Sequence, residues 1–233
     1  MSDNIGIIIQ ARMRSSRLPG KILKKLGSKT LLGQIFFRLS FLSRPAEVVL
    51  ATSDMKENDS VRDFCRSSGI SCFRGSEDNV LERYVCCAEK YGFKHVVRLT
   101  GDNPLVDIEE IDRLIGFYLS EGLDYADSFQ DLPVGMGAEI FSIGSLRESS
   151  RLGKEPHHIE HVNEYVRENI KRFKYAALSV PIEKSRPDVR LTLDTEEDYK
   201  KISYIVNSAK NEFITTQEAI ILSDLYATGA AHD

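Results

Sequence analysis

Basic side chains cluster near the N-terminus, in the segment 10–21 that directly follows the apolar run 5–9. Cations gather beside a core strand when an anionic group binds among them, and ligands bind outside the carboxyl ends of parallel strands. The cluster therefore predicts a phosphate-bearing ligand, whereas a solvated basic loop is the alternative interpretation. The four cations are Arg12, Arg14, Arg17 and Lys21.

The way in which this segment could hold phosphate follows from its residue types. Its sequence, QARMRSSRLPGK, has neither the Walker spacing nor the glycine spacing of a dinucleotide-binding loop. Without a glycine-lined backbone, phosphate must be held mainly by side chains. Arginine suits this task because its planar guanidinium can donate two hydrogen bonds to one phosphate, and Lys21 adds a point charge.

Two aspartates each follow a predicted buried strand. Asp102 lies in the sequence LTGDNPL, and Asp194 lies in LTLDTEED. Taken singly, Asp102 is explained by a tight turn. Asp194 is explained by initiation of the next helix, because Thr195 and Asp198 fit an N-terminal cap. Taken together and opposite the basic cluster, they match the ligands of a phosphate-bound Mg²⁺, which takes one or two carboxylates and phosphate oxygens.

Composition narrows the class of protein. The 233 residues are 42% hydrophobic and 28% charged, with a net charge of -4, which suits one globular domain with a full core. The negative charge argues against general nucleic-acid binding, and no apolar run approaches the roughly 20 residues that span a bilayer. With no signal-peptide pattern and no Cys-x-x-Cys pair, we expect a cytoplasmic protein whose cysteines are reduced and lie in or near the core.

Apolar runs and helical periodicity alternate through the first half of the chain. This alternation predicts an α/β fold with a mostly parallel, doubly wound sheet. The helix at 31–42 is apolar over much of its surface, which predicts heavy burial and makes a homodimer surface one interpretation. The predicted strands are 5–9, 47–51, 70–73 and 95–99, and the predicted helices are 31–42, 60–68, 80–91 and 108–120.

The alternation breaks after residue 123. The pattern then predicts strands without regular crossovers and one helix at 156–169. This change indicates a mixed or antiparallel extension beside the first half, which is a natural place for a second substrate. The strands predicted here are 125–129, 138–143, 175–181 and 189–193.

Six motifs occur in a specific order between residues 5 and 199. They are QARMxSxRLPGK from residue 10, a VVAT-like segment at 48–52, FRGSEDNVLERY at 73–84, TGDxPL from residue 100, EHV at 160–162 and LDTxED from residue 193. This order resembles the spore-coat polysaccharide (SpsF-like) cytidylyltransferases, relatives of the acylneuraminate and 3-deoxy-manno-octulosonate cytidylyltransferases. The resemblance implies a Rossmann-like nucleotidyltransferase fold in a single domain, 1–233. It divides that domain into a nucleotide-binding half at about 5–122, an acceptor-side insertion at about 123–188, and a closing strand and helices at 189–228.

The resemblance also implies an activity and roles for residues. The expected enzyme is Mg²⁺-dependent and moves CMP from CTP to a sugar, sugar acid or other small anionic acceptor, releasing pyrophosphate, in surface polysaccharide or glycoconjugate synthesis. Another nucleoside triphosphate, glycosyl transfer from a nucleotide-sugar, and non-catalytic nucleotide binding are the alternatives. The implied roles are catalysis for Arg12, Arg17 and Lys21, nucleotide binding for Gln10, Ala11, Arg14, Asp78, Arg83, Thr100 and Gly101, acceptor binding for Glu139, Glu160 and His161, and metal binding for Asp102 and Asp194.

Three of these assignments have simpler alternatives. Asp78 and Arg83 are equally explained by a helix cap and a solvated helical arginine. For Glu139 the alternative is an outward-facing carboxylate of a strand. Arg14 replaces a glycine of the family pattern, so it either adds a phosphate contact or points to solvent.

The acceptor side departs from the family pattern. Gly137 stands where family members usually carry a carboxylate, which predicts a less acidic pocket and an acceptor that bears a carboxylate or phosphate. Countercharge for that acceptor is expected from Arg147, Arg151, His158 and His161.

A zinc site is a further interpretation of the histidines at 157–161. His157 and His161 are four residues apart on a predicted helix, but the H-E-x-x-H order is absent. We therefore expect a helix that lines the acceptor pocket or contacts a second subunit.

Overall fold

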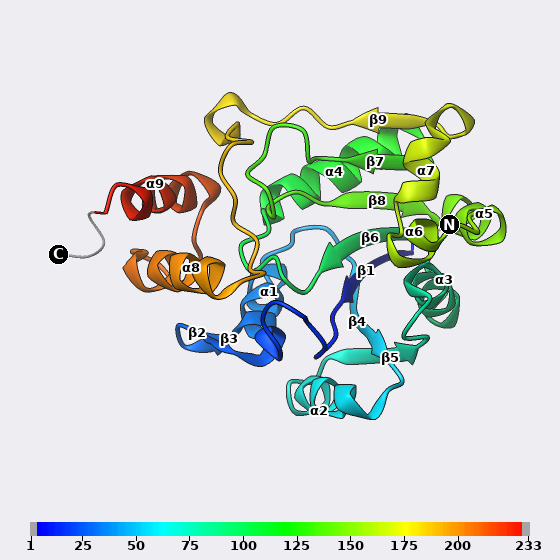
Figure 1. The fold of residues 1–233 in the computed structure, drawn as a ribbon. Coiled ribbons are helices and arrows are strands. Elements are labelled where there is room, and N and C mark those ends of the chain that lie inside the picture. Colours follow the sequence, from blue (N-terminus) through cyan, green and yellow to red (C-terminus); the bar gives the residue numbers. More distant parts are fainter. Residues whose placement is uncertain (1–3, 230–233) are drawn as a thin grey trace.

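A computed structural model describes residues 4–229, and its centre is a seven-stranded sheet (Figure 1). The strands are β1 (Ile5–Gln10), β4 (Glu47–Ser53), β5 (Ser71–Gly75), β6 (His95–Thr100), β7 (Tyr125–Asp127), β8 (Glu139–Ser142) and β9 (Tyr175–Ala177). Their order is β5-β4-β1-β6-β8-β7-β9. Within this sheet β8 runs antiparallel to β6 and β7, and the other pairs are parallel. The expected mostly parallel α/β sheet with a mixed extension is confirmed.

Helices cover both faces of this sheet, and two further helices lie on the left of Figure 1, beyond the ends of its strands. They are α1 (Leu31–Leu39), α2 (Asp59–Ser67), α3 (Val80–Tyr91), α4 (Ile108–Glu121), α5 (Ile143–Leu152), α6 (Pro156–Glu160), α7 (Glu164–Glu168), α8 (Glu196–Ser208) and α9 (Thr216–Ala227). Short elements complete the chain: the hairpin β2 (Lys25–Leu26) and β3 (Lys29–Thr30), and the 3-10 turns η1 (Lys21–Leu23), η2 (Lys56–Asn58), η3 (Ile170–Arg172) and η4 (Ile182–Lys184).

The alternation of side chains along β1 explains the two layers of helices. Ile7 and Ile9 point into one core cluster, which also holds apolar side chains of α1, α2 and α4. Ile8 points the other way, into a cluster built with α3, α5 and α7. Successive residues of a strand face opposite sides of the sheet, so a strand that is apolar at every position needs a helical layer on each side.

The strand predicted at 189–193 is wrong. Its residues alternate between buried and exposed, but their backbone groups bind two loops and no neighbouring strand. Val134 N donates to Val189 O at 2.8 Å, Leu191 N donates to Val134 O at 2.7 Å, and Leu193 N donates to Asp102 O at 2.8 Å. The segment is therefore an extended connection between loops, with one isolated bridge to the sequence at Val134.

The single helix predicted at 156–169 is wrong as well. The structure divides it into α6 and α7, with His161 in an extended conformation between them. Val162 is fully buried just after this break, so the chain turns inward there to bury an apolar side chain. The break leaves Glu160 and His161 at the end of a short helix, where they can face a cleft.

Smaller differences concern element ends and burial. The helix predicted at 31–42 ends at Leu39, and α5 and the β2–β3 hairpin were not predicted. All four cysteines are free, and Cys65 and Cys87 are buried, but Cys86 is exposed on α3, so its predicted place in or near the core is wrong. Among the described residues, the helices are too short or too polar to cross a membrane.

Candidate active site

The loop that carries the basic cluster is held at both ends by packing and by backbone hydrogen bonds. Leu18 and Ile22 are buried. Gly20 has the left-handed φ of 69°, which suits glycine, and its N–H donates to Met13 O at 3.0 Å. Met13 N in turn donates to the buried Asn58 Oδ1 at 2.8 Å. The apolar residues fix the loop. Its arginines stay partly or fully exposed, whereas Lys21 is buried.

Two further loops are bonded to this region. Gly101 N donates to Gln10 O at 2.8 Å, and Leu193 N donates to Asp102 O at 2.8 Å. A Cβ at Gly101 would lie 2.8 Å from the Cβ of Ala11 and 3.1 Å from Gln10 O. Only glycine allows this approach, and it places Asp102 and Asp194 opposite the basic loop.

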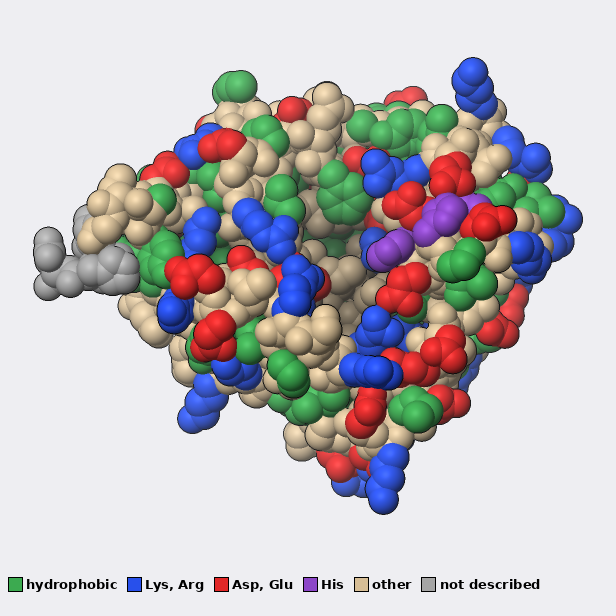
Figure 2. Space-filling view, viewed as in Figure 1, with side chains coloured by type: hydrophobic (Ala, Val, Ile, Leu, Met, Phe, Trp, Pro, Cys, Tyr) green, Lys and Arg blue, Asp and Glu red, His purple; other side chains and the backbone are tan. Residues whose placement is uncertain are grey.

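These loops enclose a cleft of about 520 Å³ at the carboxyl ends of β1 and β6, and Figure 2 shows this face hollowed near its centre. Every predicted site residue except Glu139 lines it. The predicted residues are Gln10, Ala11, Arg12, Arg14, Arg17, Lys21, Asp78, Arg83, Thr100, Gly101, Asp102, Glu160, His161 and Asp194, and the unpredicted ones are Ser15, Ser16, Ile22, Glu77 and Val80. The structure thus brings the predicted residues together, while their roles stay predictions.

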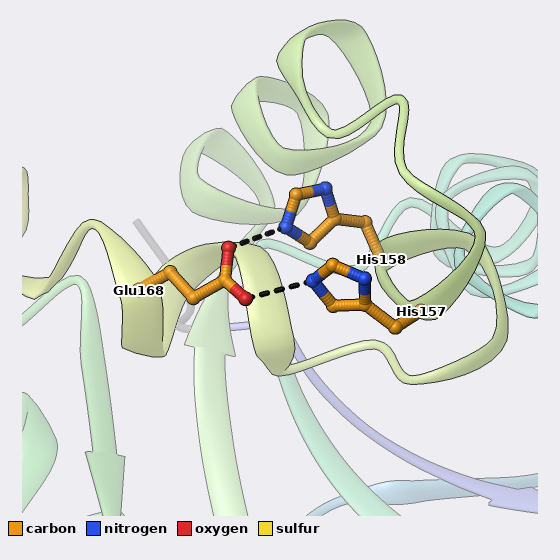
Figure 3. Close-up of side chains that lie close together, drawn as sticks. All are labelled: His157, His158 and Glu168. Carbon is orange, nitrogen blue, oxygen red and sulfur yellow. Dashed lines mark hydrogen bonds and ion pairs between the residues drawn. The ribbon is translucent and has the colours of Figure 1, made fainter.

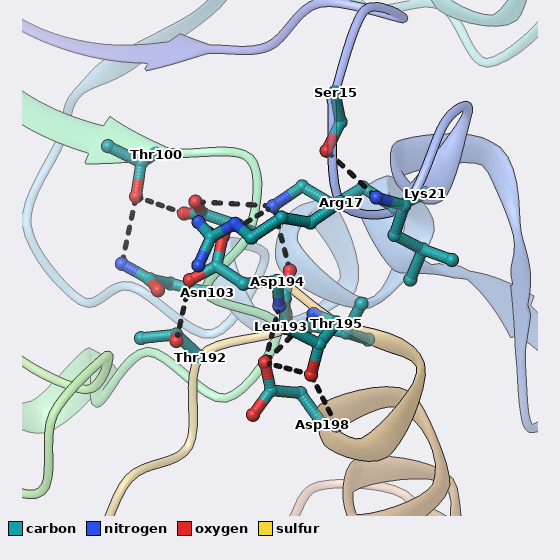
Figure 4. Close-up of polar contacts among 12 residues, drawn as sticks. Ser15, Arg17, Lys21, Thr100, Asn103, Thr192, Leu193, Asp194, Thr195 and Asp198 are labelled. Atoms are coloured by element: carbon teal, nitrogen blue, oxygen red, sulfur yellow. Dashed lines mark hydrogen bonds and ion pairs between the residues drawn. The ribbon is translucent and has the colours of Figure 1, made fainter.

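The ammonium group of Lys21 lies between the two aspartates, and Figure 4 shows its contact with Asp194. Its Nζ is 2.9 Å from Asp194 Oδ1 and 3.5 Å from Asp102 Oδ2, and it donates to Leu193 O at 2.8 Å. Arg17 also pairs with Asp194, at 2.8 Å. The point between these carboxylates therefore favours a cation, and the donor set fits the oxygen ligands of Mg²⁺.

Hydrogen bonds orient Asp102, and nearby charges act on Asp194. Thr100 Oγ1 donates to Asp102 Oδ1 at 2.6 Å, and Asn103 Nδ2 donates to Thr100 Oγ1 at 2.9 Å. Burial opposes ionisation of Asp194, but the Lys21 hydrogen bond and the charges of Lys21, Arg17 and Arg190 outweigh it and lower the pKa of this carboxyl. Asp194 is thus ionised and available to a cation at neutral pH.

The positive and negative side chains that line the cleft are equal in number. Its lining holds five basic residues and five acidic residues besides His161. The acidic ones are Glu77, Asp78, Asp102, Glu160 and Asp194, and the basic ones are Arg12, Arg14, Arg17, Lys21 and Arg83. A triphosphate would therefore bring negative charge that the side chains alone do not neutralise, which suits a site that takes a divalent cation with its nucleotide.

The outer part of the cleft contains ion pairs between its own walls. Arg12 reaches Glu160 at 2.9 Å and Glu77 at 3.4 Å. Arg14 is exposed and lines the cleft, and no ion pair to another described residue holds it. Arg14 is therefore free to contact a ligand.

The capping alternative for Asp78 and Arg83 is not what the structure shows. Asn79 is the cap of α3, since its side chain accepts from Glu82 N at 2.9 Å. Arg83 is buried, its Nη1 donates to Ser76 O at 2.6 Å, and burial lowers the pKa of its guanidinium. Asp78 and Arg83 instead share the lining of the cleft.

Buried polar atoms without a hydrogen-bond partner gather here. Burying such an atom costs free energy unless a ligand or water satisfies it. Seven are found in the described part of the chain, of which three line this cleft and two line the cavity beside it. They are Gln10 Oε1, Glu77 Oε2 and Arg83 Nε in the cleft, and Arg98 Nε and Asn103 Oδ1 in the cavity beside it.

Glu139 does not reach this cleft. It faces Arg98 in the β6–β8 register, pairs with that guanidinium, and accepts from Tyr125 Oη at 2.7 Å. It is fully buried, so neither the acceptor contact nor the outward-facing carboxylate predicted for it describes its position. A buried carboxylate needs such partners, and Glu139 fixes the position of the Arg98 guanidinium.

A second cavity of about 410 Å³ adjoins the cleft, since Thr100 and Asp102 line both. Gly137 lines this cavity, where a Cβ would lie 2.9 Å from Ser128 O; its predicted effect on the acceptor stays a prediction. The basic residues of this cavity are Arg98 and Arg167. Of the predicted sources of countercharge, Arg147 instead pairs with Glu89 on the surface, at 2.9 Å.

The histidines form a group with Glu168 (Figure 3). His157 Nε2 and His158 Nε2 each lie 2.7 Å from one oxygen of Glu168, whereas His161 lines the cleft. His158 Nδ1 accepts from Glu155 N at 3.3 Å, so its proton is on Nε2, the atom that a metal would need. The group therefore forms a hydrogen-bonded brace between α6 and α7, and the predicted pairing of His157 with His161 is absent.

Sequence reasoning missed several residues. Arg98 and Arg167 belong to the second cavity, and Arg190 pairs with Asp194 at 2.5 Å. A charged residue within the apolar strand 95–99 was the available signal for Arg98. Arg167 and Arg190 lie on segments whose shape the sequence did not predict.

Comparisons with known proteins find matches along nearly the whole chain. A family model described as cytidylyltransferase matches residues 6–223. The spore coat polysaccharide biosynthesis protein SpsF of Bacillus subtilis is 37% identical over 89% of this chain and 88% of its own length. The structure of a cytidylyltransferase from Leptospira borgpetersenii superimposes with a TM-score of 0.90 at 32% identity, covering 99% of this chain and 97% of that one.

A more distant structure shows the same fold. A CMP:2-keto-3-deoxy-manno-octonic acid synthetase complexed with CTP superimposes with a TM-score of 0.66 at 18% identity, covering 88% of this chain and 98% of that one. The predicted nucleotidyltransferase architecture is thereby confirmed.

Proposed function

The chain belongs to the cytidylyltransferase family, and from this premise we propose that it transfers CMP from CTP to a small anionic acceptor, a sugar acid or a comparable carboxylate or phosphate. The observation that carries the proposal is that the basic loop and the two aspartates line one cleft, joined through Lys21. A relative named for spore coat polysaccharide biosynthesis supports a role in the synthesis of a surface polysaccharide or glycoconjugate.

In the proposed reaction an acceptor oxygen attacks the α-phosphorus of CTP. The bond to the bridging oxygen of the β-phosphate breaks, the electron pair leaves with pyrophosphate, and the proton of the acceptor hydroxyl passes to solvent. Arg12, Arg17 and Lys21 bind the β- and γ-phosphates and stabilise the leaving charge. These cations exchange their present carboxylate partners for phosphate oxygens, so positioning and charge compensation supply the catalysis.

Asp102 and Asp194 are the residues that would hold Mg²⁺. When bound, Mg²⁺ would neutralise phosphate charge and polarise the α-phosphate. Before the nucleotide binds, Lys21 keeps the two carboxylates close together, and Thr100 fixes the orientation of Asp102 by its hydrogen bond. When Lys21 exchanges these partners for phosphate oxygens, both carboxylates become open to Mg²⁺.

The acceptor would enter through the second cavity. Arg98 and Arg167 line it, next to Asp102. The Arg98 guanidinium is held by Glu139 and keeps one buried Nε without a partner. This supports an acceptor with an anionic group, because such a group would satisfy that donor.

The test measures nucleotide preference and then turnover. Thermal shifts with Mg²⁺ and CTP, GTP, UTP or ATP should show the largest stabilisation with CTP. With CTP, pyrophosphate should then be released only when a sugar acid from a panel of acceptors is added. Stabilisation by another nucleotide, stabilisation only by a nucleotide-sugar, or CTP binding without pyrophosphate release from any acceptor would each contradict the proposal in a different way.

A further inference from the structure

A third cavity, of about 350 Å³, has no part in the reaction proposed above. Phe129 and Arg167 line both this cavity and the second one. The three cavities therefore follow one another from the basic loop, past Asp102, to the edge strand β9. The other residues that line the third cavity are Tyr125, Asp127, Gln130, Ile170 and Tyr175.

Aromatic rings form much of the wall of this third cavity. The rings of Tyr125 and Tyr175 stack with centroids 5.4 Å apart and planes 21° from parallel. Tyr125 is buried beneath Tyr175, whereas Tyr175 and Phe129 are 41% and 43% exposed. The stack holds Tyr175 rigidly while leaving part of its surface open, so the cavity offers flat apolar surface on a fixed support.

Polar groups lie beside these rings. Asp127 accepts from Tyr175 Oη at 3.0 Å and from Phe129 N at 3.2 Å, and is only 9% exposed. A carboxylate has about four acceptor positions, so Asp127 can accept further hydrogen bonds. Burial, and then the charge of Asp127, raises the pKa of Tyr175 to about 12, so its hydroxyl stays protonated and keeps the carboxylate oriented.

Donors complete the wall. Among the described residues, the ion pair of Arg167 is a long one, to Glu164 at 4.0 Å. Its side chain is largely exposed, and it lines both the second and the third cavity. Gln130 adds an amide that can donate and accept. Flat apolar surface next to a carboxylate, an amide and a guanidinium matches a ring that has an apolar C–H face and hydroxyl groups on its rim.

We propose that the third cavity is a further acceptor subsite that binds a neutral glycosyl unit, so that the acceptor is longer than a single sugar ring. This inference rests on the proposed function, because it places the reacting end of the acceptor in the second cavity. Asp127 favours a neutral ring here over an anionic one, since a second carboxylate would be repelled. The anionic group of the acceptor then lies beside Arg98.

The absence of tryptophan from the sequence makes a sharp test available. The Tyr175→Trp variant has a single tryptophan in the third cavity, and Phe41→Trp is the matched control at an exposed aromatic position on another part of the surface. Methyl β-D-glucopyranoside, a neutral single ring, is titrated into each protein without CTP. We expect a saturable change of emission in Tyr175→Trp and none in Phe41→Trp.

Two variants, each added to the Tyr175→Trp protein, test in which cavity the glucoside binds. In the Tyr175→Trp protein, Asp127→Asn should weaken glucoside binding about tenfold, the effect of one charge-assisted hydrogen bond. Asn103→Ala, in the second cavity, should leave it unchanged. No saturable change, an equal change in the Phe41→Trp control, or loss of binding in Asn103→Ala alone would overturn the subsite.

CTP binding is measured on the same proteins by thermal shift. If CTP stabilises them while the glucoside does not bind, the subsite fails and the proposed function stands. If the glucoside binds and CTP does not stabilise the wild-type protein, the proposed function fails instead.

Discussion

Lys21 and Arg12 are the residues on which nucleotide binding should depend most. Lys21 Nζ serves Asp194, Asp102 and Leu193 O at once, and Arg12 joins two glutamates across the cleft mouth. These contacts place positive charge in the cleft before a nucleotide arrives, so binding requires only a local exchange of their carboxylate partners for phosphate oxygens.

We predict that Lys21→Ala and Arg12→Ala each weaken CTP binding about tenfold or more, because each removes a charge-assisted hydrogen bond to phosphate. Calorimetric titration of CTP with Mg²⁺ measures this. Lys24→Ala is the control, since Lys24 pairs with Glu196 outside the cleft lining. Unchanged affinity in both cleft variants would remove the basis for the phosphate site.

The aspartates should matter through the metal. Asp102→Asn and Asp194→Asn keep the side-chain shape and lose the charge, so Mg²⁺-dependent pyrophosphate release should be abolished with the fold retained. Binding of Mn²⁺ in the presence of CTP, followed by water relaxation, gives a readout that is independent of turnover. The control Asp63→Asn, at an exposed ion pair on α2, should change neither pyrophosphate release nor Mn²⁺ binding. If Asp102→Asn or Asp194→Asn still binds Mn²⁺ with native affinity, that aspartate is not a metal ligand.

Elements with strong local signals could be predicted from the sequence. The strand β1 and the helix α3 carry their periodicity, caps and apolar runs within their own residues, and their bounds agree closely with those predicted. The prediction of a strand at 189–193 was wrong because alternation of apolar and polar residues indicates which side chains are buried. It does not show whether a neighbouring strand exists. The loops at Asp102 and Val134 bind it instead.

The site shows the same division at the level of its elements. Residues of the basic loop and the TGD turn could be predicted, because they follow strands whose carboxyl ends meet at one edge. Glu139 could not be placed, since its burial depends on facing Arg98 across the β6–β8 pair. Arg167 reaches the second cavity only because α6 and α7 are separate helices, which the apolar pattern did not reveal.

The close approach of β6 to the basic loop makes a prediction of its own. Gly101→Ala should lower the free energy of unfolding by about 1–3 kcal/mol, because the new Cβ has no room beside Ala11 and Gln10 O. It should also weaken CTP binding by pushing the loop away. Gly144→Ala is the control, since its Cβ would meet only ordinary contacts, the nearest at 3.6 Å; equal urea denaturation of the two variants would show that the approach is not tight.

The whole molecule presents cavities in series along one side of its sheet, with the charges of the nucleotide cleft in balance. Five basic and five acidic residues line that cleft, even though the chain as a whole carries a net charge of -4. The protein therefore does not attract a polyphosphate through a large positive field. Its affinity for CTP must come from local exchange of ion pairs and from the cation that accompanies the nucleotide.

We therefore predict that CTP binding requires a divalent cation. At a CTP concentration 100 times its dissociation constant, binding should stabilise the protein by about 2.7 kcal/mol, seen as a rise in melting temperature with Mg²⁺. Adding EDTA should remove most of this rise, because the carboxylates of the cleft then repel the unneutralised triphosphate. EDTA without CTP is the control and should leave the melting temperature unchanged. An equal rise with and without Mg²⁺ would mean that the side chains alone neutralise the triphosphate, and the assignment of Asp102 and Asp194 as metal ligands would have to be abandoned.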